Sequence, residues 1–230
     1  APRLRFDTSF VVSGAPFASR IDWLEPGRIL AHLASSTPVY QSSVRLYDEE
    51  GRLLSSFHDR RGEYANHSYL ISALVPVLAS SRRWIVAGGS LFYPLVKYAR
   101  GEAGRVDTTG TPIGRPPSSW RQAVPPESRA TGPAMSAQLE RWFRSFDSVA
   151  DVEIYRDSLL LVAHESISEA TLAYRDIGYR MDAYRMTGEK IAEDVELPGK
   201  LLAGGRHVHV LVSDPPGPWR IGVFDLSLDR

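Results

Sequence analysis

The chain contains no cysteine, and its 230 residues include one asparagine and only three lysines. Without cysteine there can be no disulfide, catalytic thiolate, iron–sulfur cluster, c-type haem attachment or cysteine-bound zinc. Neither charge is in excess, since 27 basic residues balance 27 acidic ones. This balance, with basic residues scattered along the chain, removes the electrostatic footprint of a nucleic-acid-binding protein.

Long hydrophobic runs are missing as well. The longest apolar stretch, Tyr69 to Ala79, is interrupted by Ser72 and Pro76, and it falls short of the roughly 20 residues that span a bilayer. The chain starts with Ala-Pro rather than Met, which fits a mature product after signal-peptide cleavage, a start from which Met has been trimmed, or a truncated chain. The first of these and the family resemblance described below favour export. We therefore expect a periplasmic or otherwise exported protein, with the cytoplasm as the alternative.

Short apolar runs make up most of the regular pattern. Four of them, bounded by Gly, Pro, Ser or Asp, predict buried strands: residues 28–33, 84–87, 159–163 and 208–212. Each is followed by another predicted strand with an aromatic residue near its end: Tyr47, Tyr98, Tyr184 and Phe224. Glycines soon after the three tyrosines can supply the positive φ that tight hairpin turns need.

These four aromatic residues are 51, 86 and 40 residues apart. A period of about 40–50 residues with several short strands in each is typical of β-propeller blades. The long gap predicts an insertion over residues 107–147, which begins as an aperiodic loop rich in Pro and Gly. The insertion continues as a predicted helix over about 134–148, because apolar residues recur there at helical spacing: Met135, Leu139, Trp142, Phe143, Phe146 and Val149.

We therefore predict an all-β fold, a single β-propeller domain over residues 1–230 with four recognisable blade units. The units cover residues 14–57, 70–106, 148–197 and 198–230. The last unit ends after its third strand, and the alternation of Leu4, Phe6 and Phe10 predicts a strand at the N-terminus. We expect residues 3–12 to complete the last blade beside residues 219–226, because an open ring leaves unpaired sheet edges.

Three segments resemble blades of bacterial propellers of the NHL/TolB-like kind. They are V-R-L-Y-D-E-E-G-R-L-L-S-S-F from residue 44, Y-R-M-T-G-E-K-I-A-E-D-V-E-L-P-G from residue 184, and H-V-H-V-L-V-S-D-P-P-G-P-W-R-I-G-V-F-D-L from residue 207. Propellers of that kind usually have six blades, so four units imply either an unusually small ring or part of a larger one. The resemblance implies a fold and not an activity.

Metal and cofactor sites have little support in the sequence. Lactonase-like propellers resemble this fold and bind calcium through Glu, Asp and two or more Asn side chains, whereas Asn66 is the only asparagine here. His207 and His209 have a spacing that suits a metal on a strand, but no acidic pair accompanies them, so they are weak candidates. Serine-hydrolase, phosphate-binding and dinucleotide-binding motifs are absent. We predict no catalytic residue, no metal and no cofactor.

Candidate partner-binding residues lie in three places. Trp120 and Arg121 are at the centre of the Pro-rich loop, Trp142 and Phe143 are on the predicted helix, and Trp219 follows Asp-Pro-Pro-Gly-Pro. Trp and Arg are enriched among binding hot spots, and long irregular loops in compact domains are often functional. The alternative is structural: Trp120 caps the propeller's own groove, and the helix lies on the propeller.

These observations predict a non-catalytic propeller that acts as a protein-binding or scaffolding module. The specific hypothesis is an extrinsic accessory subunit of a bacterial membrane-bound complex, of the electron-transfer or photosynthetic reaction-centre type. The alternative is a propeller hydrolase, lactonase-like enzyme or sugar-binding protein with its site in the central channel. A polar channel mouth with histidine would favour that alternative.

Overall fold

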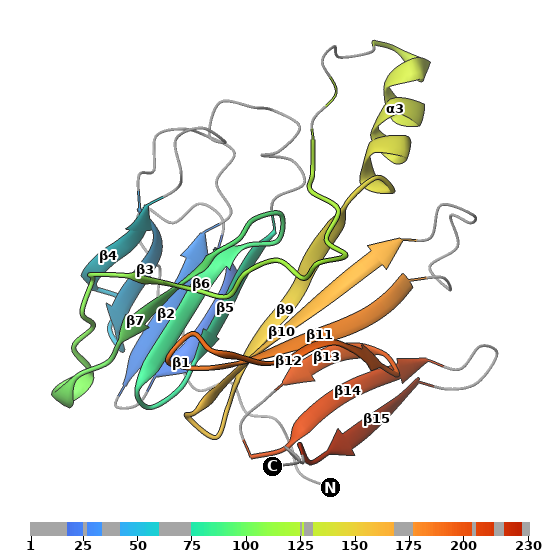
Figure 1. Cartoon of the computed structure of the whole chain (residues 1–230). Coiled ribbons are helices and arrows are strands. Elements are labelled where there is room, and N and C mark those ends of the chain that lie inside the picture. Colours follow the sequence, from blue (N-terminus) through green and yellow to red (C-terminus); the bar gives the residue numbers. More distant parts are fainter. Residues whose placement is uncertain are drawn as a thin grey trace, which may run out of the picture.

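The computed structural model describes residues 18–24, 27–33, 42–59, 75–124, 126, 131–167, 177–203, 206–213 and 219–226. Within these ranges, fifteen strands form four antiparallel sheets, and the only α-helix is α3 (Pro133–Phe143). The predicted all-β propeller class is therefore confirmed. Figure 1 shows the sheets in chain order, with α3 standing above them at one end.

Each sheet is built from strands that are consecutive in the chain. The first contains β1 (Ala18–Leu24), β2 (Arg28–Leu33), β3 (Ser42–Asp48) and β4 (Leu53–Asp59). The second contains β5 (Pro76–Ser80), β6 (Trp84–Gly89), β7 (Leu95–Ala99) and β8 (Thr111–Ile113). The third contains β9 (Asp147–Tyr155), β10 (Leu159–Ile167), β11 (Ile177–Arg185) and β12 (Lys190–Leu197). The fourth contains β13 (Lys200–Ala203), β14 (Val208–Ser213) and β15 (Trp219–Phe224).

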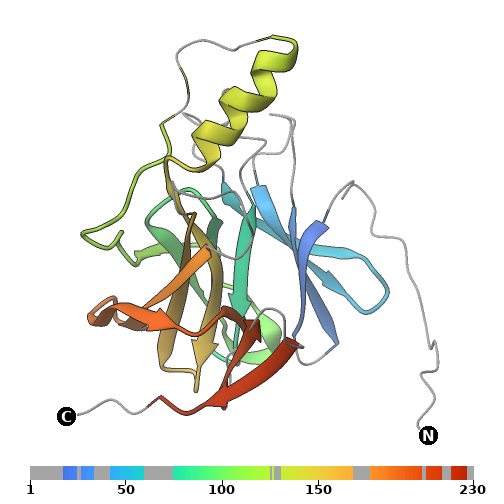
Figure 2. The same ribbon diagram turned by 90° about the vertical axis from the view of Figure 1, so that its right-hand side faces the viewer.

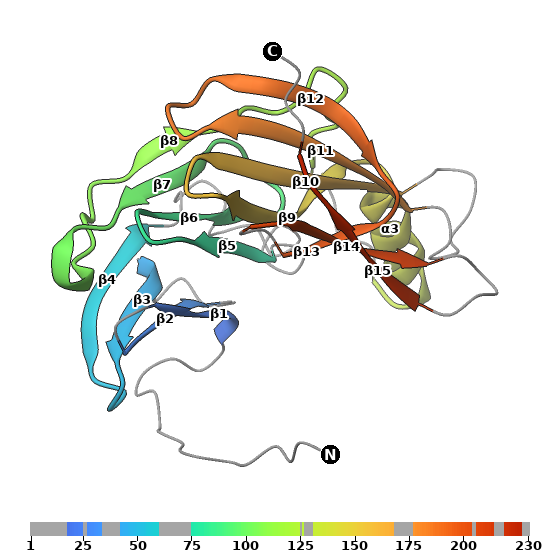
Figure 3. The same ribbon diagram turned by 90° about the horizontal axis from the view of Figure 1, so that it is seen from below.

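The sheets are arranged in a ring with the first strand of each on the inside. β1 contacts β5, β5 contacts β9, and β9 contacts β13. Figure 3 shows this arrangement from below, with β4, β8 and β12 toward the outside. First strands inside and last strands outside are the arrangement of propeller blades.

The second strand of the third sheet explains why the sequence shows continuous apolar runs. Leu160 and Val162 of β10 pack in the core shared with the second sheet. Leu161 and Ala163 point the other way and pack in the core shared with the fourth sheet. A central strand between two neighbouring sheets is buried on both faces, so its sequence does not alternate.

The three tyrosines singled out in the sequence mark equivalent positions. Tyr47, Tyr98 and Tyr184 lie on the third strands of the first three sheets, and all three are buried. Gly51 and Gly188 follow the first and last of them in hairpin turns, with φ of 80° and 99°. These features confirm four blade units and two of the three predicted glycine turns. The third was wrong, because Gly101 after Tyr98 is extended, with φ of −91°.

Two boundaries differ from the prediction. The second blade was expected to end at residue 106, but β8 lies inside the predicted insertion and pairs with β7. A three-residue strand that contains Pro112 has no period-two pattern and therefore gives no strand signal.

The helix is also shorter than predicted, because it ends at Phe143 instead of continuing to residue 148. Phe146 lies in the turn after the helix, and Val149 already belongs to β9. The backbone N–H of Asp147 donates to the carbonyl of Arg121 at 3.0 Å, and that of Val149 donates to Ser90 at 2.7 Å. Because of these long-range bonds, residues 144–146 form a turn and residues from 147 form a strand, although the apolar residues there are spaced as in a helix.

The predicted N-terminal strand over residues 3–12 lies outside the described residues, so this expectation stays a prediction. In the part of the chain that the structure describes, β15 pairs only with β14. The fourth sheet therefore has one strand fewer than the other three.

Candidate functional site

The loop that follows β8 is fixed to the third sheet through a buried carboxylate. Asp182 is fully buried, and its Oδ2 lies 2.8 Å from Lys190 Nζ and 3.0 Å from Tyr184 Oη. Tyr184 Oη also lies 2.7 Å from the carbonyl oxygen of Arg115 in the loop. The other carboxylate oxygen of Asp182 accepts the backbone N–H of Asp194 at 2.8 Å. One acid thus joins the loop, the third strand and the outer strand of the blade.

The pKa values of Tyr184 and Lys190 are both raised, for different reasons. Burial raises the pKa of Tyr184 to about 12, so its hydroxyl keeps its proton and remains a donor. Burial is the largest single influence on Lys190 and lowers its pKa, but the hydrogen bonds to Asp182 and Glu193 and the neighbouring charges together outweigh it and leave the pKa raised. The ammonium therefore stays charged beside the carboxylate.

Further contacts continue along the loop to residue 121. The backbone N–H of Ser118 donates to Glu193 Oε1 at 3.0 Å. Arg121 donates to Asp147 Oδ1 from Nε at 3.0 Å and from Nη2 at 2.7 Å, and its backbone N–H donates to Oδ2 at 2.8 Å. Arg121, a predicted partner-binding residue, is therefore paired within the molecule.

Trp120 lies in an aromatic cluster at the top of the core between the second and third sheets. Its ring is perpendicular to Tyr93 at 5.4 Å and tilted at 70° to His164 at 5.5 Å between centroids. It is half-buried against this core. This is the arrangement expected of a residue that caps the propeller's own groove; the expected partner contact of Trp120 stays a prediction.

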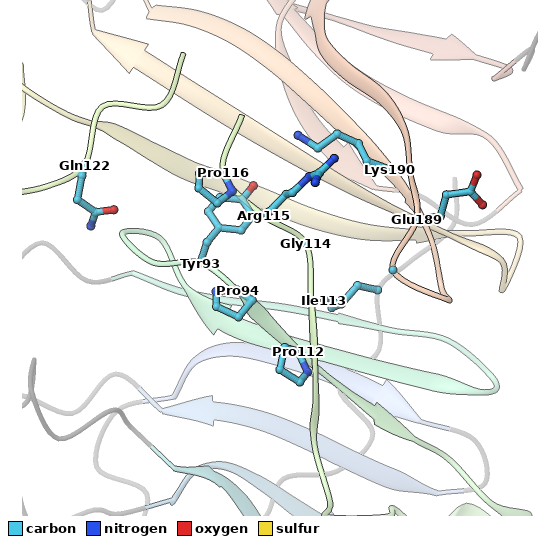
Figure 4. Close-up of a pocket in the computed structure, with 11 residues that line it drawn as sticks. Tyr93, Pro94, Pro112, Ile113, Gly114, Arg115, Pro116, Gln122, Glu189 and Lys190 are labelled. Carbon is cyan, nitrogen blue, oxygen red and sulfur yellow. The ribbon is translucent and has the colours of Figure 1, made fainter. Parts of the chain in front are cut away.

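Two cavities flank this loop. The larger, of about 620 Å³, lies between the loop and the turn that joins β11 to β12. Figure 4 shows Tyr93, Pro94 and Pro112 along one part of it, with Lys190 and Glu189 coming from the β11–β12 side. The smaller, of about 190 Å³, is lined by Trp120, His164 and charged residues of the third sheet. We call this smaller one the His164 cavity.

A third cavity, of about 280 Å³, lies where the inner strands meet, and we call it the axial cavity. Arg20, Lys200 and Ser148 reach it from β1, β13 and β9, and Val75 and Ser90 from beside β5 and β6. Its described lining includes no histidine. The lining carries charges of both signs from Arg20, Lys200 and Glu165 beside apolar residues that include Leu91, Phe143 and Phe146, and it lacks the histidine that would have favoured a channel site.

The charges near the axial cavity are unevenly paired. Arg20 Nη2 lies 3.2 Å from Asp151 Oδ2, which joins opposite inner strands. Burial raises the pKa of Asp151, while the nearby Arg20 and Lys200 oppose that rise. Among the described residues, no hydrogen bond or ion pair holds the Lys200 ammonium. The Lys200 ammonium therefore faces the cavity without a hydrogen-bonded acid, while Asp151 interacts with it through charge and Glu165 lines the same cavity.

The helix directs its largest side chain inward. Trp142 is buried with Leu91, Ala123 and Phe146, and its indole N–H donates to the carbonyl of Val124 at 2.8 Å. Phe143 is 38% exposed. Figures 1 and 2 show α3 standing clear of the sheets apart from its C-terminal end. Of the two predicted partner-binding residues here, only Phe143 offers much surface to another molecule.

The remaining sequence candidates lie on the fourth sheet. Trp219 begins β15. His207 Nδ1 lies 2.9 Å from Asp225 Oδ1, and His209 lies on β14 opposite Val223. No group of three or more metal-ligating side chains occurs within the described ranges. No helix among those same residues has the length and apolar character needed to cross a membrane.

The largest exposed apolar side chains lie on the first and fourth sheets. Ile21 and Trp23 of β1 are 68% and 59% exposed, on the face opposite the one that packs on the second sheet. Ile221 and Val223 of β15 are 63% and 60% exposed, on the face opposite the one that packs on the third sheet. We call these surfaces the two end faces.

In comparisons with known proteins, no family model, no curated protein and no solved structure matches the chain. The propeller arrangement therefore rests on the structure itself.

Sequence reasoning missed the residues around which these sites are built. Tyr93 and His164 are 71 positions apart in the chain and meet only in the folded protein. Asp182 lies inside a strand, where an acid between apolar neighbours was the one available signal. The end faces carry a signal that could have been used, because Ile21 and Trp23 alternate with Arg20 and Asp22.

Proposed function

We propose that this protein is a non-catalytic propeller that binds another protein through its two end faces. The observation that carries this proposal is the exposure of Ile21, Trp23, Ile221 and Val223. Contiguous exposed apolar surface on a soluble protein commonly marks a protein–protein interaction site. The partner we expect is a protein that presents an apolar sheet face, because flat pleated surfaces pack on one another.

The other sheet faces support this assignment by contrast. The first and second sheets, the second and third, and the third and fourth bury apolar side chains between them. On the face that carries Ile21 and Trp23, the side chains of Ile29, Ala31, Leu33 and Tyr47 on β2 and β3 form a buried cluster of their own, so the exposed part of that end face is β1. The exposed side chains of β1 and β15 have no adjacent sheet packed on them among the described residues. A partner that covers the end faces would bury their exposed apolar side chains, as an adjacent blade does on the other sheet faces.

More specific forms of the proposal come from the sequence. Kinship with bacterial NHL/TolB-like propellers is supported by the blade segments from residues 44, 184 and 207. An exported accessory subunit of a membrane-bound complex fits a propeller that binds another protein through exposed apolar faces. Its partner should then be recovered from detergent-solubilised membranes.

The test places a charge on each end face separately. Trp23→Lys and Ile221→Lys should each abolish recovery of the partner when the tagged protein is purified from cells that produce it naturally. Val195→Lys is the matched control, because Val195 is also exposed but lies on the outer strand β12 of the third sheet. Both variants should keep the wild-type melting temperature.

Quantitative mass spectrometry of the recovered proteins decides the outcome. Equal recovery of every associated protein by wild type, both end-face variants and the control would refute the proposal. Recovery of only further copies of this chain, with sedimentation showing dimers that the variants lose, would replace it with self-association.

The axial cavity supports a second candidate, a small-molecule site in the channel. Arg20 and Lys200 bring two cations to it, next to the Glu165 carboxylate and apolar residues such as Phe143, and no described acid lies within ion-pair distance of Lys200. Such a site suits a ligand with a carboxylate or phosphate group. Calorimetric titration with simple organic acids and inorganic phosphate tests this, with Lys200→Ala as the variant that should lose binding.

A further inference from the structure

Two kinds of side chain line the axial cavity. Three of them are charged: Arg20, Lys200 and Glu165. Most of the others are apolar, namely Val75, Leu91, Phe143, Phe146, Val149 and Ala150. A concave site with apolar walls and a few charged groups suits a small molecule that itself has an apolar part and a charged part.

The charge of Arg20 is already balanced within the protein. Its Nη2 lies 3.2 Å from Asp151 Oδ2, and the Asp151 side chain is only 7% exposed. This pair joins two inner strands and leaves the cavity with the charges of the other two lining residues.

Lys200 and Glu165 each carry a charge that no ion pair balances. Among the described residues, no acid lies within ion-pair distance of the Lys200 ammonium, and no cation lies within that distance of the Glu165 carboxylate. Asp151 acts on Lys200 through charge, but its ion-pair partner is Arg20. Both Lys200 and Glu165 are partly exposed. The cavity therefore has one cation and one anion that are available to a ligand and are not paired with each other.

The Glu165 carboxylate also keeps hydrogen-bonding capacity. Its Oε1 accepts from Ser148 Oγ at 3.0 Å, and no other bond to this side chain occurs in the described chain. An ionised carboxylate can accept several hydrogen bonds. A ligand ammonium can thus bind Glu165 without displacing Ser148.

The apolar lining is incompletely covered by the protein itself. Phe143 is 38% exposed and Val75 is 53% exposed, although both line a cavity. Phe143 and Phe146 have ring centroids 6.1 Å apart and lie at the end of α3, which meets the sheets there (Figure 2). An apolar group in the cavity would cover part of this surface and gain from its removal from water.

The volume of the cavity limits the size of the ligand. It is about 280 Å³, just below the roughly 300–1,000 Å³ of sites for drug-sized ligands. A single small molecule fits this space better than a peptide. Among small molecules, an amino acid combines a carboxylate, an ammonium and a side chain around one carbon atom.

We propose that the axial cavity binds a free α-amino acid with an apolar side chain. The ligand carboxylate pairs with Lys200, the ligand ammonium pairs with Glu165, and the ligand side chain packs against Phe143. This inference rests on the second candidate function, a small-molecule site in the channel, and names its ligand. It does not depend on the binding of a partner to the end faces.

The experiment separates the contributions of the two ligand charges by calorimetric titration of the full chain at pH 7. The probes are L-phenylalanine with hydrocinnamate and phenethylamine, and L-leucine with isocaproate and isoamylamine. In each set the second compound lacks the ammonium and the third lacks the carboxylate. At least one of the two amino acids should bind with a dissociation constant of about 1 mM or below, and its two analogues roughly tenfold or more weakly.

Two substitutions should act on different analogues. Glu165→Gln should weaken binding of the amino acid and the amine roughly tenfold without weakening that of the carboxylate analogue. Lys200→Ala should weaken binding of the amino acid and the carboxylate analogue without weakening that of the amine. Glu196→Gln is the matched control, because Glu196 is exposed on β12 and is not part of this lining. Glutamine can still accept from Ser148, so Glu165→Gln should keep the wild-type melting temperature.

Three results would overturn the inference. The first is binding of hydrocinnamate or isocaproate as tight as that of the amino acid, which would leave the second candidate function as a simple anion site. The second is no saturable binding of any probe or of inorganic phosphate, which would reject that candidate function as well. The third is amino-acid binding that Glu165→Gln does not weaken, which would place the ligand ammonium elsewhere.

Discussion

The core between the second and third sheets and the two end faces use the same kinds of residue with opposite outcomes. In the core, Val162, Leu160 and Tyr184 are buried, and Trp120 covers them from the loop. On the end faces, Trp23 and Ile221 have the same apolar character but remain about 60% exposed. Alternation along a strand thus indicates that a face is apolar, but not what covers it.

The covered region has a second property that the end faces lack. Beneath the loop, Asp182 and Lys190 form an ion pair whose side chains are 0% and 6% exposed. Neither charge can return to water without opening the blade. Apolar packing and a buried ion pair therefore fix the same loop, whereas Ile21 and Trp23 lie beside the buried cluster of Ile29, Ala31, Leu33 and Tyr47 without belonging to it.

The largest effect should come from Asp182→Ala. The substitution leaves the Lys190 ammonium buried without its main partner, and breaking a buried pair in this way costs about 3–5 kcal/mol. Urea denaturation measures the change in the free energy of unfolding. Glu189→Ala is the control, because its ion pair with Arg185 is exposed and its loss should cost less than about 1 kcal/mol. Equal effects of the two substitutions would contradict the role given to burial.

A pair of tryptophan substitutions compares the two regions directly. Trp120→Ala should lower the free energy of unfolding by about 2–3 kcal/mol, somewhat less than a fully buried tryptophan. Trp23→Ala should change it by no more than about 0.5 kcal/mol, because most of its side chain is already in water. The same denaturation experiment measures both. A larger loss from Trp23→Ala would mean that its face is covered within the isolated protein.

The smallest effect concerns pH. Burial lowers the pKa of His164 below its usual 6.5, although Asp182 partly opposes the shift. As pH falls through about 6.5, the unfolded chain binds a proton at this residue that the folded chain does not. Stability is therefore lost on acidification, by at most about 1.4 kcal/mol per pH unit.

The control for this pH dependence is His164→Phe, which keeps an aromatic ring and removes the titrating group. Its free energy of unfolding should fall less steeply than that of wild type between pH 6.5 and 5. Parallel curves for the two proteins would show that His164 takes up its proton equally well in the folded state.

The blade pattern could be predicted because it depends on residues that are close together in the sequence. Apolar runs such as 159–163 identify central strands, and Tyr47, Tyr98 and Tyr184 mark third strands although the segments between them differ in length. β8 and the end of α3 could not be predicted, because pairing with β7 and bonds to Arg121 and Ser90 decide them. Local periodicity carries no information on such distant partners.

Predicting the candidate sites was harder, since they join residues from several blades. The sequence drew attention to Trp120 and Arg121, which the structure places beside the His164 cavity. It gave no reason to connect them with His164, Glu165 or Arg180, which lie on two other strands. Residue type indicated a functional loop, but the chemistry of the cavity depends on the opposite wall.

The short outer strand of the second sheet affects how the protein behaves at high concentration. β8 has only three residues, and Pro112 at its centre has no backbone N–H, so another chain finds little there to extend as an intermolecular sheet. β15 has six residues, with Arg220 as its only charged side chain. The outer edge of the second sheet thus resists intermolecular pairing, whereas β15 is open to it wherever the predicted strand over residues 3–12 does not cover its edge.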